Sequence, residues 1–339
     1  MNDERRQPSA EPAATSSPDV QTWGLFLLLS VMWGGSYLFI KIALDEGVAP
    51  LTLVSLRTIF GTLFLAGVMW FVKGRLPRSG RGWFDLGVVG MTNVVVPYAL
   101  ITWGELHISS GMTGIVVALA PLFTVVLATF VLREERLNSL GIGGVVVGFA
   151  GVVLLALPSV VDTSGADGVL PLAGMVAVGL AALSYAVALV YTRRRLTGRA
   201  LVGTRDGETR PLTALEISFG QVFVAMIVIT AVAIVFERPR GGLIALPEGF
   251  TAIFAIVWLG ILGTGVAYLL YFAIINRWGA TRASLIAYVM PIVSIALGFV
   301  ILDERLRPAE IAGAVLIIGG VVLVNARPKP KPVPAEANP

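Results

Sequence analysis

The stretch PIVSIALGFVILDERLRPAEIAG, from Pro291 to Gly313, is a close variant of PLFTVVLATFVLREERLNSLGIGG, from Pro121 to Gly144. Each copy begins at a proline, continues through an apolar run, breaks into a short charged turn and becomes apolar again. The copies are separated by roughly half of the 339-residue chain. We therefore expect the chain to contain two related halves.

The composition is that of a membrane protein. Hydrophobic residues make up 56% of the chain and charged residues only 14%, against about 45–50% and about 25% in soluble domains. A spanning helix needs about 20 apolar residues. Ten such runs lie at 23–44, 51–72, 83–104, 110–132, 139–158, 171–192, 213–236, 251–274, 283–302 and 310–326. Because they are continuous and do not alternate, we expect an all-α membrane protein with ten transmembrane helices.

The two ends of the sequence are polar and rich in proline. Residues 1–21 and 327–339 cannot bury a core, so we expect both to be disordered tails. The chain has no cysteine, which excludes disulfides and thiol chemistry. We expect no cofactor.

The distribution of Lys and Arg predicts the orientation in the membrane. If the N-terminus is cytoplasmic, 19 of the 25 basic residues fall in cytoplasmic segments, four fall outside, and Lys41 and Arg57 lie within helices. Short cytoplasmic loops carry an excess of Lys and Arg. We therefore expect a multi-pass protein of the cell membrane with both termini cytoplasmic, and no nucleic-acid partner.

An offset of 170 residues places identical residues on one another: Gly90 on Gly260, Tyr98 on Tyr268 and Pro121 on Pro291. The repeat unit is then five helices, in residues 22–158 and 171–326. Because five is odd, the second unit enters the membrane from the opposite side. Two inverted five-helix repeats are typical of secondary transporters, which bind substrate between the repeats near the membrane midplane.

These features resemble one family. The segment WGGSYLFIKIAL in the first helix, the prolines Pro121 and Pro291, and the turns EERL and DERL are similar to those of EamA-type members of the drug/metabolite transporter superfamily. The resemblance covers about residues 22–326. It implies export, or sometimes uptake, of small metabolites such as amino acids or drugs through a central cavity, without ATP.

Proline and glycine mark where helices bend or approach closely. Pro121 and Pro291 lie near the middle of their helices, where we predict a gating hinge; a static bend is the alternative. Gly144 and Gly148 form a small-residue face, and the helix around Gly313 is similarly smooth. Such faces serve helix association. Helices 139–158 and 310–326 should therefore be scaffold, and the protein a monomer or homodimer.

The predicted binding residues are mostly neutral and aromatic. Near the midplane the sequence places Trp33, Tyr37, Asn93, Tyr98, Ser184, Tyr185, Gln221, Tyr268 and Tyr288, a mixture suited to a small-molecule substrate. Lys41 and Arg57 could form a positive outer vestibule that receives carboxylates, or could serve only in snorkelling and packing. The acids Asp85, Glu105 and Glu216 lie at helix ends, so no proton-relay carboxylate is expected.

The alternatives are a membrane-embedded enzyme or a sensor. The single histidine, His107, cannot form a two-histidine metal site, and neither a P-loop nor a full dinucleotide motif is present. A receptor would normally add a soluble domain, but the longest internal loop runs only from Arg193 to Leu212. The sequence favours a non-enzymatic transporter whose partners are its substrate and the lipid bilayer.

Overall fold

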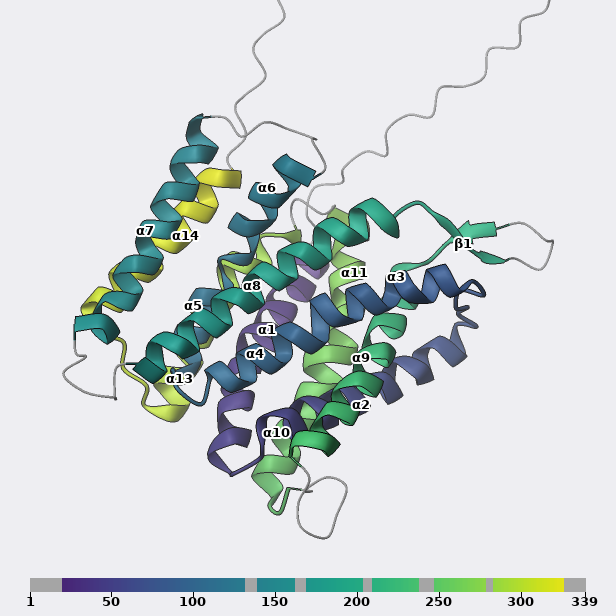
Figure 1. Ribbon diagram of the computed structural model, residues 1–339, viewed down its shortest axis with the longest axis horizontal. Coiled ribbons are helices and arrows are strands. Elements are labelled where there is room, and N and C mark those ends of the chain that lie inside the picture. Colours follow the sequence, from purple (N-terminus) through teal and green to yellow (C-terminus); the bar gives the residue numbers. More distant parts are fainter. Residues whose placement is uncertain are drawn as a thin grey trace, which may run out of the picture.

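The computed structural model describes residues 20–131, 139–161, 169–203, 209–237, 247–278 and 283–325. These residues form a helical bundle with one small hairpin (Figure 1). The elements are α1 (Val20–Asp45), α2 (Pro50–Phe71), α3 (Gly80–Gly90), η1 (Met91–Val95), α4 (Val96–Gly104), α5 (Ser110–Val117), α6 (Ala120–Val131), α7 (Ser139–Val161), α8 (Val169–Arg195), β1 (Ala200–Gly203), β2 (Thr209–Pro211), α9 (Ala214–Phe236), α10 (Phe250–Gly260), η3 (Ile261–Val266), α11 (Ala267–Trp278), α13 (Ile286–Leu302) and α14 (Pro308–Asn325). The predicted tails lie almost wholly outside the described residues.

The predicted all-helical membrane class is confirmed. Eight helical segments are long and apolar enough to cross a membrane, and α13 and α14 are shorter apolar helices. Large apolar side chains such as Trp70, Phe236 and Val300 are exposed on the bundle. In a membrane these side chains would contact lipid, which replaces water as the solvent of the outer surface.

Two of the predicted spans contain a π-helical turn that sequence reasoning missed. The third span is α3, η1 and α4, and the eighth is α10, η3 and α11. The two π-turns begin at Met91 and Ile261, positions related by the 170-residue offset. Such turns widen the helix locally and often occur at functional sites.

The two proline-containing spans differ. In the fourth span the helix is interrupted at Ala118–Leu119, so that Pro121 is the second residue of α6. There the missing N–H of proline removes no helical hydrogen bond. In the ninth span α13 is continuous and Pro291 lies inside it. The helix is therefore interrupted near the proline in only one of the two copies, and the predicted gating role of Pro121 and Pro291 stays a prediction.

Helices α7 and α14 pack side by side at one edge of the bundle (Figure 1). A Cβ atom added at Gly144 would lie 2.7 Å from the carbonyl oxygen of Gly320, and one added at Gly151 would lie 2.7 Å from that of Gly313. The glycines therefore let the two backbones touch. The predicted helix association occurs within the chain, which leaves these glycine faces unavailable to a second chain.

The two ends of the bundle differ in charge. At the arginine-rich end, defined by Arg75, Arg195 and Arg210, the β1–β2 hairpin pairs antiparallel beside the start of α9. At the acidic end, the carboxylates Asp45, Glu105, Glu237 and Glu304 lie near the end of α1 and the starts of α2 and α5. These two names are kept below.

Candidate functional site

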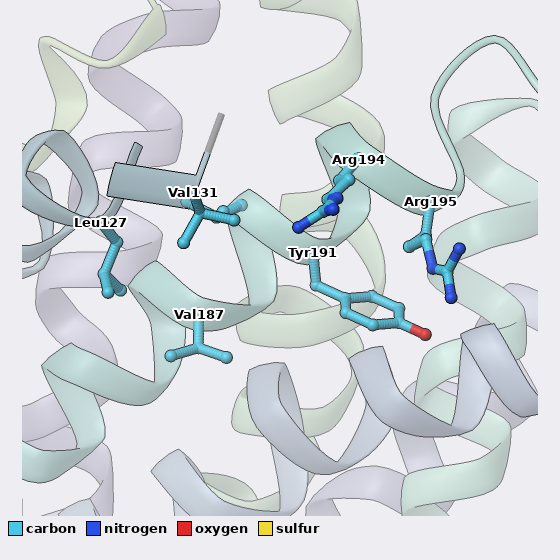
Figure 2. A pocket seen from close by; sticks show the side chains of 7 residues that line it. Leu127, Val131, Val187, Tyr191, Arg194 and Arg195 are labelled. Carbon is cyan, nitrogen blue, oxygen red and sulfur yellow. The ribbon is translucent and has the colours of Figure 1, made fainter. Parts of the chain in front are cut away.

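A cavity opens between α6 and α8 at the arginine-rich end. Its volume is about 420 Å³, and its walls are Leu127, Val131, Val187, Val190, Tyr191, Arg194 and Arg195. Figure 2 shows Leu127, Val131 and Val187 along one side and the two arginines towards the other. None of these residues was predicted from the sequence.

The first cluster of hydrogen-bonded polar side chains inside the bundle lies around η1. The Asn93 side chain donates to Gln221 Oε1 at 2.9 Å and to the Tyr268 hydroxyl at 3.2 Å. Ser184 Oγ donates to the backbone oxygen of Thr92 at 2.7 Å. The π-turn therefore gathers predicted binding residues from α8, α9 and α11.

The second cluster of polar side chains lies around η3. Arg57 Nε donates to Thr264 Oγ1 at 3.0 Å, and its guanidinium carbon lies 4.0 Å from the centre of the Tyr98 ring. The Arg57 residue is only 5% exposed. A guanidinium over an aromatic face is stabilised by the quadrupole of the ring. Thr264 was missed because a threonine inside an apolar run carries no distinctive signal.

The two clusters of polar side chains belong to one site, because tyrosine side chains pack between them. Tyr98 is in the core cluster against which Tyr185 and Tyr268 pack, and Tyr185 also packs on the cluster that contains Tyr37. We call this set the central site: Tyr37, Arg57, Asn93, Tyr98, Ser184, Tyr185, Gln221, Thr264 and Tyr268. Ser184 lies about one helical turn along α8 from Val187, which lines the cavity.

Three predicted residues are placed away from the central site. Trp33 packs against Tyr271, with ring centres 5.2 Å apart. The Tyr288 hydroxyl donates to the Val321 backbone oxygen at 3.1 Å and so faces α14. Lys41 Nζ donates to the backbone oxygen of Glu105 at 2.9 Å. Because Arg57 is buried, Lys41 and Arg57 do not line an open vestibule in this structure.

Two glutamates at the acidic end have roles that the sequence did not indicate. Glu304 Oε1 accepts from the Ser110 backbone N–H at 2.9 Å, and Oε2 accepts from the Ser110 hydroxyl at 2.8 Å and the Gly111 N–H at 3.1 Å. It therefore caps α5 from the far half of the chain. Glu105 is 0% exposed, and neither of its carboxyl oxygens has a hydrogen-bond partner among the described residues.

An ion-pair network holds the arginine-rich end. Glu216 accepts from the Arg75 backbone N–H at 2.7 Å and from the Arg210 guanidinium at 2.7 and 2.8 Å. The hydrogen bond to Glu216 raises the pKa of Arg210. The contact links the segment after α2 to β2 and α9. Among the described residues, no three His, Asp or Glu side chains form a group that could hold a metal ion.

Comparison with known proteins gives the family. The model of the EamA-like transporter family matches the chain twice, at residues 22–157 and 172–326. An uncharacterized transporter of Archaeoglobus fulgidus is 27% identical, over 90% of this chain and 99% of the relative. A probable terminal-alkyne amino-acid exporter of Streptantibioticus cattleyicolor is 26% identical, over 90% and 93%.

The fold is also found in a known crystal structure. It matches with a TM-score of 0.60 at 19% identity, over 90% of this chain and 96% of the other. The double family match, its bounds and the apolar helices agree with the expected resemblance. Relatives and family description name transporters rather than enzymes. The chain belongs to the EamA-like transporter family.

Proposed function

We propose that this protein is a secondary transporter that carries small organic molecules through the central site by alternating access. The supporting observation is that the central site joins the two family matches. Arg57 of the first match donates to Thr264 of the second, and Asn93 of the first donates to Gln221 of the second. A relative movement of the two halves would therefore change the site directly.

In this proposal the chain has ten spanning helices in two inverted repeats. The paired π-turns at Met91 and Ile261 support it, because equivalent turns in both copies place Asn93 and Thr264 within one residue of equivalent positions in their spans. In an inverted repeat each half can adopt the conformation of the other, which opens the site to one side and then to the opposite side.

The arginine-rich end is cytoplasmic in this proposal, because Lys and Arg accumulate in cytoplasmic loops. The cavity between α6 and α8 then opens to the cytoplasm of the cell. At the acidic end Glu304 ties α13 to the start of α5. A cavity open to the cytoplasm and closed outside is a state that can load an exported substrate, and the exporter named among the relatives supports the same direction, so we favour export.

The substrate class follows from the chemistry of the central site. Arg57 offers a guanidinium that is held by one threonine and one tyrosine ring. Guanidinium binds carboxylate in a bidentate manner, and the surrounding tyrosines suit an apolar side chain. We therefore propose amino acids or similar amphipathic carboxylates. The name of the amino-acid exporter in Streptantibioticus cattleyicolor supports this class.

The test is efflux from proteoliposomes that contain purified protein and are loaded with amino acids, neutral analogues or cationic amines. We expect Arg57→Gln to reduce carboxylate efflux by at least tenfold, because a charge-assisted hydrogen bond contributes about 1.5–3 kcal/mol. Neutral and cationic substrates should be affected less. The matched control is Arg305→Gln, which removes a side chain that is 78% exposed.

Equal loss for all three substrate classes would contradict the role of Arg57. Absence of protein-dependent efflux for every class would contradict the transporter itself. Melting temperatures of the two variants separate a folding defect from a loss of recognition, since a substrate that binds the native state raises the melting temperature.

A further inference from the structure

The Glu105 carboxyl is the most unusual polar group in the described part of the chain. It is fully buried, and both of its oxygens lack a hydrogen-bond donor. The turn that carries it folds inward: an added Cβ on the neighbouring Gly104 would lie 3.0 Å from the Gly174 carbonyl oxygen of α8. A charged carboxylate is very costly at such a place, whereas a protonated carboxyl loses much less hydration.

The charged groups around Glu105 come from several elements. Lys41 and Asp45 belong to α1, Arg57 to α2, and Glu304 follows α13. The two cations are occupied elsewhere: Lys41 donates to the backbone oxygen of Glu105 and lies 3.8 Å from Asp45, and Arg57 donates to Thr264. They favour the charged carboxyl through space, and the two anions oppose them.

One further titratable group interacts with this carboxyl, and another follows it closely in the sequence. The Tyr37 hydroxyl of the central site interacts electrostatically with Glu105. The ring of His107, two residues along the chain, packs on Trp103 with ring centres 4.8 Å apart. Neither donates a hydrogen bond to the carboxyl oxygens. Glu105 therefore faces a mixed set of charges without a direct partner.

The elements around Glu105 also close the acidic end. Lys41 holds the turn after α4 to α1, and Glu304 holds the start of α5. If the acidic end opens during transport, these contacts are the ones that separate, and the Glu105 carboxyl meets water. A carboxyl that is buried in one state and hydrated in the other binds a proton more tightly in the buried state.

We propose that Glu105 is a proton-binding site that takes up one proton when the acidic end closes. On closing, a proton from the solution at that end adds to one carboxylate oxygen and gives the neutral acid. On opening, the O–H bond breaks and the proton returns to water. The proposal rests on the opening and closing that the proposed function requires. A proton fits this site better than an organic ammonium, because both oxygens are enclosed by protein.

The experiment uses the cysteine-free chain reconstituted in proteoliposomes, with one reporter cysteine at Thr113→Cys. Thr113 is fully buried in α5 and should react with an impermeant thiol reagent only when the acidic end opens. A second reporter at the exposed Glu46 position, Glu46→Cys, corrects for the pH dependence of thiol reactivity. No substrate is added, so the result does not depend on transport.

The corrected labelling rate of Thr113→Cys should rise by up to about tenfold per pH unit over the range in which Glu105 titrates. Glu105→Gln, which stays neutral, should label slowly at every pH, whereas Glu105→Asp should keep the pH dependence. Lys41→Gln should move the rise to higher pH, because removal of a cation makes the proton harder to lose. Asp45→Asn is the matched change of opposite sign: it removes an exposed anion that favours the protonated carboxyl, so it should move the rise to lower pH and keep its slope.

A direct readout accompanies the labelling. The infrared carbonyl band of a protonated carboxylic acid should be present in the wild-type protein and absent from Glu105→Gln. Its absence from the wild type, a labelling rate without pH dependence, or the same dependence in Glu105→Gln would overturn the proposal. No labelling of Thr113→Cys at any pH would overturn this proposal, because the acidic end would then not open around Glu105. The proteoliposome efflux assay described above tests the transporter separately, because protein-dependent efflux without labelling would leave the proposed function standing.

Discussion

The two copies of the proline-containing span have similar sequences and different structures. In the first copy the helix is interrupted at Ala118–Leu119, and its second part, α6, borders the cavity at the arginine-rich end. In the second copy α13 is continuous through Pro291, and Glu304 just after it holds the start of α5. Closely related sequences thus adopt two conformations in one molecule.

This difference teaches how an internal repeat can serve transport. The proposed alternating access requires two related halves in different conformations, so that one end is closed while the other is open. The counterpart of Glu304 in the first copy is Glu135, which lies outside the described residues. The following substitutions test whether the contacts that distinguish the two copies can be broken.

The largest effect is expected from Gly114→Val. A Cβ at Gly114 would overlap the Ser294 side chain, so valine must push α5 away from α13. Overpacking costs about 1–3 kcal/mol, which would favour opening of the acidic end by roughly 5- to 150-fold. Hydrogen–deuterium exchange of residues 110–117 should accelerate by that factor.

The control for this change is Gly67→Ala, because no atom lies within 4 Å of an added Cβ at Gly67. It should leave the exchange of residues 110–117 unchanged and slightly stabilise α2. Unchanged exchange in Gly114→Val would mean that α5 and α13 do not separate at this contact.

A smaller effect is expected from Glu304→Gln. The amide keeps one acceptor oxygen but loses the charge that strengthens the hydrogen bonds to Ser110 and Gly111. We expect a loss of about 1–2 kcal/mol and roughly tenfold faster labelling of Thr113→Cys. Glu310→Gln changes a carboxylate that accepts from the nearby Arg307 N–H, within the same helix start, and should not change the labelling. Equal labelling in the two variants would contradict a gate role for Glu304.

The smallest effect is expected from the prolines. Pro121→Ala and Pro291→Ala should each change turnover by roughly two- to fivefold, below about 1 kcal/mol, because neighbouring groups satisfy the backbone around an intramembrane proline. The shift between the two accessible states should have opposite sign in the two variants. Substrate affinity and turnover are measured separately in proteoliposomes. Wild-type turnover in both variants would leave the prolines a packing role only.

Much of the fold could be predicted from the sequence, because apolar runs in lipid have few alternatives to a helix. The spacing of the glycines in α7 and α14 also indicated that these helices pack closely against another helix. The central site was partly predictable: Tyr98 and Tyr268 are related by the repeat, and both belong to it. Trp33 and Tyr288 were predicted from their depth in the span, and depth does not fix the contacts that they make with Tyr271 and Val321.

Three features could not be predicted, each for a physical reason. The π-turns depend on packing, since Gly90 lies against the backbone of Gln221. Thr264 is a binding partner only because η3 turns it towards Arg57. Glu105 was assigned to a helix end, where acids are usually hydrated. The turn after α4 instead folds against α8 and buries it.

The glycine contact between α7 and α14 has a consequence for biosynthesis. Gly144 and Gly151 of α7 reach their partners only when Gly313 and Gly320 of α14 have been made. During synthesis α7 therefore enters the membrane long before its partner leaves the ribosome. A chain that stops before Pro308 would leave the glycine face of α7 without the helix that covers it in the structure. Completion of α14 is thus the step that allows the close backbone contact of α7 to form.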